Sequence, residues 1–298
     1  MKLKLIIYCF ILSFVSAVNA FSQNTSYKIT VTPLSSNLYK FSCGVNNWLV
    51  SAGPDGVLLS DSAPEKYAEG TKAELKKLGH EKAAYIINTH WHHDHCGGNL
   101  LFGKDAVIIA QHSVRKDLAM DKYISIFDEH FKAYPEYALP NMTFSKEVKI
   151  YFNSEEITVK HFPGGHSASD AAVYFKNADV IHIGDMAVMG QFPSVDFDNG
   201  GNVEQLAEHL KKIISEAGPE TKIITGHLDD TDRQGLIEYR AMLLATVNIV
   251  KQQMKRGADL KEMQEKDILK EWRSWGKHLT CNMWIKTIYE SLNQKILK

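Results

Sequence analysis

The chain has 298 residues, of which 44% are hydrophobic, and its 34 lysines and arginines nearly balance its 35 aspartates and glutamates. This length allows one large domain or two modest ones, and the near-neutral charge gives no electrostatic basis for binding nucleic acid or anionic lipid. Only three of the four cysteines lie beyond an N-terminal apolar run. That number excludes a disulfide framework, although one bridge is possible.

The first 20 residues are expected to be a secretory signal peptide. Lys2 and Lys4 precede the apolar run of residues 5–18, and the small residue Ala20 ends the segment. The alternative, a membrane anchor, would need a run of ~20 apolar residues, which is longer than this one. We therefore predict an exported protein, periplasmic or secreted, whose mature chain starts near Phe21 and keeps no stable membrane span.

The elements that follow alternate between short strands and helices. The expected strands of the first half cover residues 27–34, 37–44, 47–53, 56–62, 83–89 and 106–110, and a helix is expected over 65–78. Residues 113–140 predict a helix followed by irregular chain. In the second half, strands are expected over 142–152, 155–162, 171–175, 180–185 and 222–227, and a helix over 203–217. Strand runs in both halves, each followed by a helix, indicate an α/β protein.

After Asp232 the pattern is helical, with helices expected over 233–256, over 268–275 and at the C-terminus. The last helix carries one apolar stripe at helical spacing. The stripe consists of Trp284, Ile285, Ile288, Tyr289, Leu292 and Ile296. We expect it to pack on the main domain.

The run INTHWHHDHCGGN, residues 87–99, places four histidines and an aspartate in six positions. Because strand side chains alternate, His90 and His92 can point the same way at the end of the preceding strand. Four histidines buried together without a metal would repel one another or stay unsatisfied. The cluster with Asp94 and His95 therefore predicts a divalent-metal site. His93 is expected to face away from it.

Further donors lie where later strands end. His166 lies in the glycine-rich turn PGGHSASD, Asp185 follows the apolar run VIHIG, and His227 follows KIITG. Each position suits a site assembled along one sheet edge. The remaining histidines considered are expected to be surface or core residues: His80, His112, His130, His161, His209 and His278.

These motifs, in this order, resemble those of the metallo-β-lactamase superfamily. THWHHDH matches its H-x-H-x-D-H signature, and PGGHSASD, IGDM and ITGH resemble its later metal motifs, so that the resemblance covers roughly residues 27–227. It implies a four-layer αβ/βα sandwich of two mixed sheets flanked by helices over residues 21–230. A C-terminal helical extension, residues 231–298, would pack on this domain.

The resemblance also implies roles for eight residues. His90, His92 and His166 would bind one metal, Asp94, His95 and His227 a second, Asp185 would bridge both, and Asp61 would support the site from behind. The expected cofactors are two zinc ions, with other divalent metals possible, which together hold a water and lower its pKa. Asp94 would orient that water and pass a proton to the leaving group. Cys96 is expected to pack under the turn.

The substrate class is less sharply indicated. Strongly active β-lactamases of the family carry cysteine or serine in place of Asp185, and those with cysteine have a lysine where this chain has Val188. Asp185 resembles the bridging aspartate of glyoxalase II, lactonases and phosphodiesterases, which implies hydrolysis of an ester, lactone or amide. The chain departs from the family pattern at Leu228, where glycine is usual. A β-lactamase-like enzyme with weak β-lactam hydrolysis, a mononuclear iron dioxygenase, and a non-catalytic metal-binding or partner-binding protein are the alternatives.

Loops over the metal edge should contact a small-molecule substrate. The candidates are residues 123–137 and 189–197, with Trp91 shaping the floor of the site. An aromatic, weakly charged mouth would favour a neutral ester or lactone. No nucleic-acid partner is expected, and the sequence indicates no particular oligomeric state.

Overall fold

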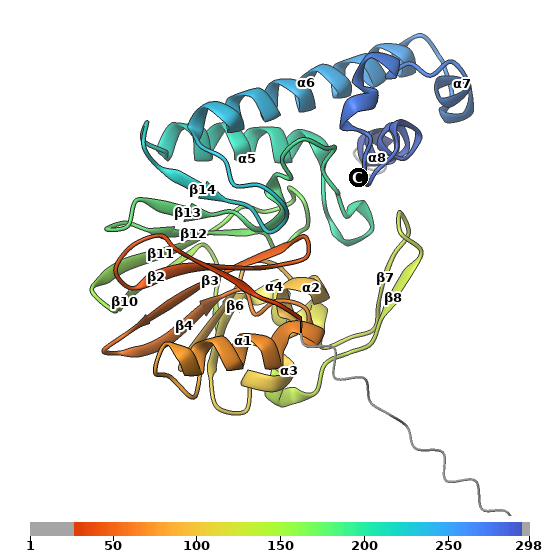
Figure 1. The fold of residues 1–298 in the computed structure, drawn as a ribbon. Helices are drawn as coiled ribbons and strands as arrows, with labels where there is room; N and C mark the ends of the chain where they lie inside the picture. The colour runs from red at the N-terminus through yellow and green to blue at the C-terminus, as the bar shows by residue number, and fades with distance from the viewer. Residues whose placement is uncertain (1–26, 294–298) are drawn as a thin grey trace, which may run out of the picture.

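The computed structural model describes residues 27–293 (Figure 1). The predicted signal peptide, residues 1–20, and Ile296 of the apolar stripe lie outside this range. No helix within it has the length and apolarity needed to cross a membrane.

Two mixed sheets form the centre of the fold. The first has the order β1-β2-β3-β4-β5-β6-β9, with parallel pairing from β4 onward and antiparallel pairing before it. Its strands are β1 (Thr30–Pro33), β2 (Leu38–Cys43), β3 (Asn46–Gly53), β4 (Gly56–Ser60), β5 (Tyr85–Asn88), β6 (Val107–Gln111) and β9 (Met142–Phe144). The second has the order β10-β11-β12-β13-β14, in which only the last pair is parallel. Its strands are β10 (Glu147–Phe152), β11 (Glu155–His161), β12 (Ala171–Phe175), β13 (Val180–His182) and β14 (Lys222–Ile224).

The period-two alternation of strand side chains places apolar residues on both faces of the first sheet. In β4, Leu58 packs against the second sheet, whereas Val57 and Leu59 pack under α1 (Glu65–Lys77). In the neighbouring strand β5, Ile87 packs against the second sheet and Ile86 packs under α1. Both faces of the first sheet are therefore buried.

Helices cover the outer face of each sheet. α1 and α3 (Asn99–Phe102) lie on the first sheet, and α5 (Val203–Glu216) and α6 (Arg233–Lys255) lie on the second. Figure 1 shows the resulting order of layers from α1 at the bottom to α5 and α6 at the top. The predicted four-layer αβ/βα sandwich is confirmed.

Two predicted segments have a different structure. Residues 142–152 form two strands in different sheets, because the chain crosses from β9 to β10 between Phe144 and Glu147. In the segment predicted to be helix and irregular chain, α4 (His112–Leu118) is followed by a hairpin. The hairpin consists of β7 (Lys122–Ile124) and β8 (Glu129–Phe131) and joins neither main sheet. It is called the β7–β8 hairpin below.

The C-terminal helices continue the core of the second half. Three elements follow α6: α7 (Leu260–Glu265), the 3₁₀ helix η4 (Lys270–Trp275) and α8 (Cys281–Asn293). α7 was not predicted, and η4 takes the place of the predicted helix over 268–275. Trp284 of α8 is fully buried, donates from Nε1 to Thr246 Oγ1 at 3.0 Å and stacks on Phe192 with ring centroids 5.6 Å apart. Cys43, Cys96 and Cys281 are all free thiols.

The stacking of Trp284 predicts a large cost for its removal. Trp284→Ala should lower the free energy of unfolding by about 3–5 kcal/mol, because it leaves a cavity between α8, α6 and the Phe192 loop. Urea denaturation followed by circular dichroism measures this difference. Tyr151→Ala, at a side chain that is 73% exposed on β10, is the control and should change stability by no more than about 0.5 kcal/mol. Equal midpoints for the two variants would contradict the expectation.

Candidate metal centre

Strand ends from both halves of the sandwich converge at one edge. β5 ends at Asn88, and His90 and His92 follow it directly, before the short helix α2 (His93–Cys96), which carries Asp94 and His95. The other donors follow strands of the second sheet or lie in the loop before β12: Asp185 in η2 (Gly184–Met186) after β13, His227 after β14, and His166 before β12. All seven predicted donors therefore come together, in two adjacent groups.

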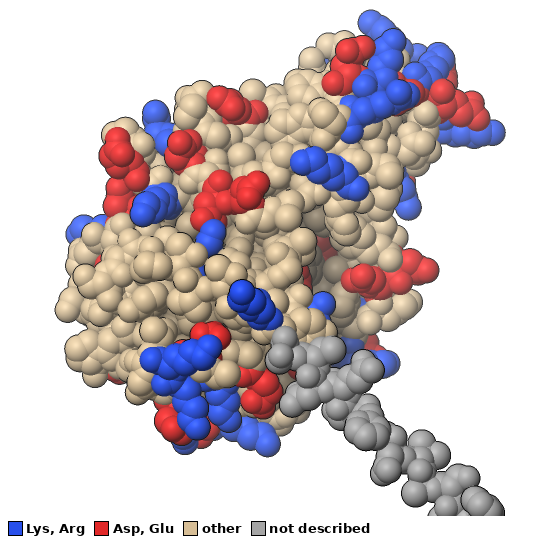
Figure 2. All heavy atoms as spheres, viewed as in Figure 1, with Lys and Arg blue, Asp and Glu red and all other residues tan. Residues whose placement is uncertain are grey.

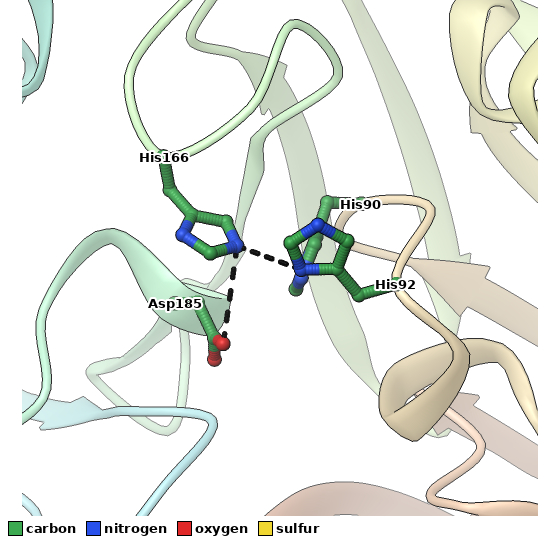
Figure 3. A group of neighbouring side chains, drawn as sticks. All are labelled: His90, His92, His166 and Asp185. Carbon is green, nitrogen blue, oxygen red and sulfur yellow. Dashed lines mark hydrogen bonds and ion pairs between the residues drawn. The ribbon is translucent and has the colours of Figure 1, made fainter. Parts of the chain in front are cut away.

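The first group contains His90, His92, His166 and Asp185, whose ligand atoms all lie within 4.8 Å of one another. Figure 3 shows their side chains pointing toward a common point from three separate segments. His166 Nε2 lies 2.9 Å from His92 Nδ1 and 3.9 Å from Asp185 Oδ2. All four side chains are buried.

The second group contains Asp94, His95 and His227, also within 4.8 Å. His227 Nε2 lies 3.1 Å from Asp94 Oδ2 and 3.1 Å from Asp185 Oδ2, and His95 Nε2 lies 3.1 Å from Asp185 Oδ1. Asp185 thus approaches histidines of both groups, as a bridging carboxylate would.

These spacings fit divalent metal ions. A tetrahedral ion with bonds of ~2.0–2.1 Å holds its ligand atoms roughly 3.3 Å apart. In the first group, His166 Nε2 and His92 Nδ1 lie 2.9 Å apart. In the second group, His95 Nε2 and His227 Nε2 lie 3.4 Å apart. His90 Nε2 is buried without a hydrogen-bond partner among the described residues. An uncompensated buried nitrogen aimed at the other donors is what a missing cation would leave.

The second nitrogen of each buried imidazole is held in place. His92 Nε2 donates to Asp196 Oδ2 at 3.1 Å, and His166 Nδ1 donates to the Ser194 carbonyl at 2.6 Å. These bonds leave His92 Nδ1 and His166 Nε2 as the nitrogens that face the site. Asp196 and Ser194 were not predicted individually, because they support the histidines only through the folded loop 189–197. Such partners fix the tautomer and orientation of a metal-binding histidine.

Asp61 has the position that was predicted for it behind the site. Its Oδ2 accepts from His95 Nδ1 at 2.8 Å and from Thr89 Oγ1 at 2.8 Å, and its Oδ1 accepts from the Thr89 amide. Thr89 Oγ1 in turn lies 3.0 Å from His90 Nδ1. One buried carboxylate therefore orients a histidine of each group.

The carboxylates of the site remain ionised. Burial alone would raise the pKa of Asp185, but His227 and His95 lower it well below its usual range. Burial likewise opposes the charged form of His227, whose pKa is nevertheless raised to about 10, chiefly by Asp185 and then by Asp94. The site thus attracts positive charge, which is the electrostatic requirement of a cation site.

Of three residues beside the donors, His93 and Trp91 lie elsewhere than predicted, and Cys96 lies where it was predicted. His93 does not face away: it lines the cavity, and burial together with His92 lowers its pKa to about 4. Trp91 does not form the floor: it is fully buried behind His92, in a cluster with Leu118. Cys96 is buried under the turn, as predicted, with Sγ 3.0 Å from the His90 carbonyl.

Both groups open onto one cavity of about 1340 Å³. Its walls include parts of both predicted substrate segments, 123–137 and 189–197. His130 and His278 also line it, although they were predicted to be surface or core residues. Leu228, which also lines it, has a left-handed backbone with φ +60°. This conformation gives a physical reason for the glycine that the family usually has at this position.

Residues 42–227 match the family described as the metallo-beta-lactamase superfamily. The chain belongs to this superfamily. Membership supports a metal-dependent hydrolase as the general class of activity, and the two donor groups are compatible with the metal binding that is usual in the superfamily.

Individual proteins are also similar to this chain in sequence or in fold. The chain is 30% identical over 193 residues to an uncharacterized protein of Aquifex aeolicus (strain VF5), covering 61% of this chain and 90% of that protein. The metallo-beta-lactamase from Pontibacter korlensis superimposes with a TM-score of 0.60 at 15% identity, covering 73% of this chain and 99% of that one. The DIM-1 metallo-beta-lactamase superimposes with a TM-score of 0.59 at 16% identity, covering 73% of this chain and 98% of that one. At these identities the two structures show the shared fold alone.

The Asp61 contacts predict weaker metal binding when its carboxylate is removed. Asp61→Ala should weaken zinc affinity by about 10–100-fold, because His95 and Thr89 lose their shared acceptor. Competition with a chromophoric chelator measures the affinity, and a thermal melt verifies that the variant is folded. Asp105→Ala removes an exposed carboxylate whose one ion pair among residues 27–293 is with Lys82, at 3.2 Å, and serves as the matched control. Unchanged zinc affinity in a folded Asp61→Ala protein would show that Asp61 does not support the site.

Proposed function

We propose that this protein is an exported dinuclear zinc hydrolase that cleaves an ester, lactone or amide bond of a small organic substrate. The observation that supports this proposal is the position of Asp185 between the two donor groups. Its carboxylate lies 3.1 Å from both His95 and His227 of the second group and 3.9 Å from His166 of the first. Export rests on the pattern of residues 1–20 alone.

When bound, a pair of divalent cations supplies an activated water and polarises the scissile group. Asp94 is the best-placed side chain for moving a proton between that water and the leaving group. Its carboxylate is 40% exposed, compared with 8% for Asp185, and it lines the cavity. Asn46 Nδ2 donates to Asp94 Oδ2 at 3.2 Å and orients it. Asn46 was not singled out from the sequence, because it lies 48 positions before Asp94.

The absence of a lysine at Val188 argues against a dedicated β-lactamase. Val188 lines the cavity and its apolar side chain is buried, so this position offers no cation for a drug carboxylate. Cys96 is not available as a nucleophile either, because its thiol is buried beneath the turn and directed at the His90 carbonyl. Both features support hydrolysis of a substrate other than a β-lactam, without a covalent enzyme intermediate.

Metal analysis and turnover together test the proposal. The purified mature chain should contain two zinc ions by elemental analysis and should hydrolyse members of an ester, lactone and amide panel. A chelator should abolish this activity and added zinc restore it, and His92→Ala should lower kcat/KM by more than about 100-fold. His80→Ala, at a histidine outside the cavity and both donor groups, is the matched control. Activity that survives both chelation and His92→Ala would refute the proposal. Bound iron in the purified protein, together with oxygen consumption during turnover, would favour the mononuclear iron dioxygenase instead.

The proposed role of Asp94 predicts a dependence on the leaving group. Asp94→Asn preserves the shape but cannot carry the proton, so kcat should fall by about 10²–10⁴-fold for alkyl esters. The fall should be much smaller for nitrophenyl esters, whose leaving group needs no proton. Steady-state kinetics with both ester types measure the difference, with zinc content determined in parallel. The same loss for both esters would assign Asp94 to metal binding alone.

A further inference from the structure

We infer that the substrate carries a bulky, uncharged, apolar group, held beside the metal centre in the cavity that the β7–β8 hairpin and residues 277–279 line. This inference deepens the proposed function and rests on it for the identity of the reacting bond. It names the part of the substrate that the cavity recognises.

The size of the cavity is the first argument. Its volume of about 1340 Å³ exceeds the ~300–1,000 Å³ that is usual for small-molecule sites. A short ester placed at the donors would leave most of this space filled with water. A substrate that uses the cavity must therefore extend well beyond the reacting bond.

One wall of the cavity begins next to the proposed metal ligands. His93 is followed in the chain by Asp94, and its ring lies 4.4 Å from that of Phe131 and 4.6 Å from that of Tyr134. All three side chains line the cavity. They form a continuous aromatic surface that runs outward from the site, which we call the aromatic wall. Such a surface favours an apolar group by removing it from water.

Another part of the lining joins the β7–β8 hairpin to residues 277–279. Phe127, at the tip of the β7–β8 hairpin, packs against His278 with ring centroids 5.3 Å apart. The His278 amide donates to Gln191 Oε1 at 3.2 Å, and the adjacent Leu279 is buried. Figure 1 shows the hairpin reaching from the first half of the molecule toward α8. Together these side chains enclose the space over the donors.

The charges around the cavity balance. Apart from the metal donors, Glu65 and Glu129 line it together with Lys66, Lys132 and Lys277. Lys132 pairs at 2.6 Å with Asp121, which is not a lining residue, so its charge is already compensated. Figure 2 shows a hollow on this face with mostly uncharged surface around it and side chains of both signs nearby. Since neither sign dominates, the walls favour a neutral group over a carboxylate.

Chain length and charge of the substrate test the inference. With zinc-loaded protein, kcat/KM for ethyl esters of straight-chain acids from acetate to decanoate should rise roughly two- to fourfold per methylene until the wall is covered. Monoethyl esters of dicarboxylic acids of matched length should be poorer substrates. Phe131→Ala should reduce the decanoate-to-acetate ratio by at least about tenfold. Tyr151→Ala, on the exposed face of β10, should leave the ratio unchanged.

A binding measurement separates this inference from the proposed function. Calorimetry with decanamide and acetamide should show much tighter binding of the longer amide. The result should be the same with metal-loaded and metal-free protein, because the aromatic wall contains none of the seven proposed metal ligands. Phe131→Ala should weaken decanamide binding by at least about tenfold. A flat chain-length profile, a preference for the anionic half-esters, or equal binding of both amides would overturn the inference even if metal-dependent hydrolysis is found. Tight decanamide binding without turnover would uphold it and refute the hydrolase.

Discussion

The whole site depends on a close backbone approach between the two halves of the sandwich at Gly226. The Gly226 amide donates to the Gly184 carbonyl at 2.7 Å, and its own carbonyl accepts from the Asn47 amide at 2.8 Å. A Cβ atom at Gly226 would overlap with Asp185 Oδ1 and with the ring of His95. Only glycine lets β14 end so close to these two donors. The absence of a side chain at Gly226 therefore leaves the space in which Asp185 of the first group lies 3.1 Å from His95 of the second.

The parts of the site that could be predicted are those that the local chain encodes. Donors that directly follow buried strands were identified, because parallel strands bring their carboxyl ends to one edge. Asp196, Ser194 and Asn46 were missed, because each acts on a histidine or carboxylate far away in the sequence. Their own surroundings are ordinary loop and strand ends, which carry no pattern that distinguishes them.

The error at His93 has a physical cause. Alternation of side chains was extended to the residues after Asn88, but β5 ends there. His93 begins α2, so its direction follows helical rather than strand geometry, and it points into the cavity. Trp91 precedes this turn and is buried behind it. The β7–β8 hairpin was missed for a related reason, since its strands are too short to show a period.

The C-terminal segment contributes residues 277–279 to the cavity, and the helices on either side of them pack into the core of the second half. The apolar stripe of α8 is used internally: Trp284, Ile285 and Ile288 are fully buried and Leu292 nearly so. Within the described residues, α8 therefore presents no broad apolar face to a protein partner, which weighs against α8 as an interaction module. The same packing holds Phe192, a residue of the cavity wall, against Trp284. One buried side chain of α8, Trp284, thus both stabilises the second half and supports a residue that lines the space beside the donors.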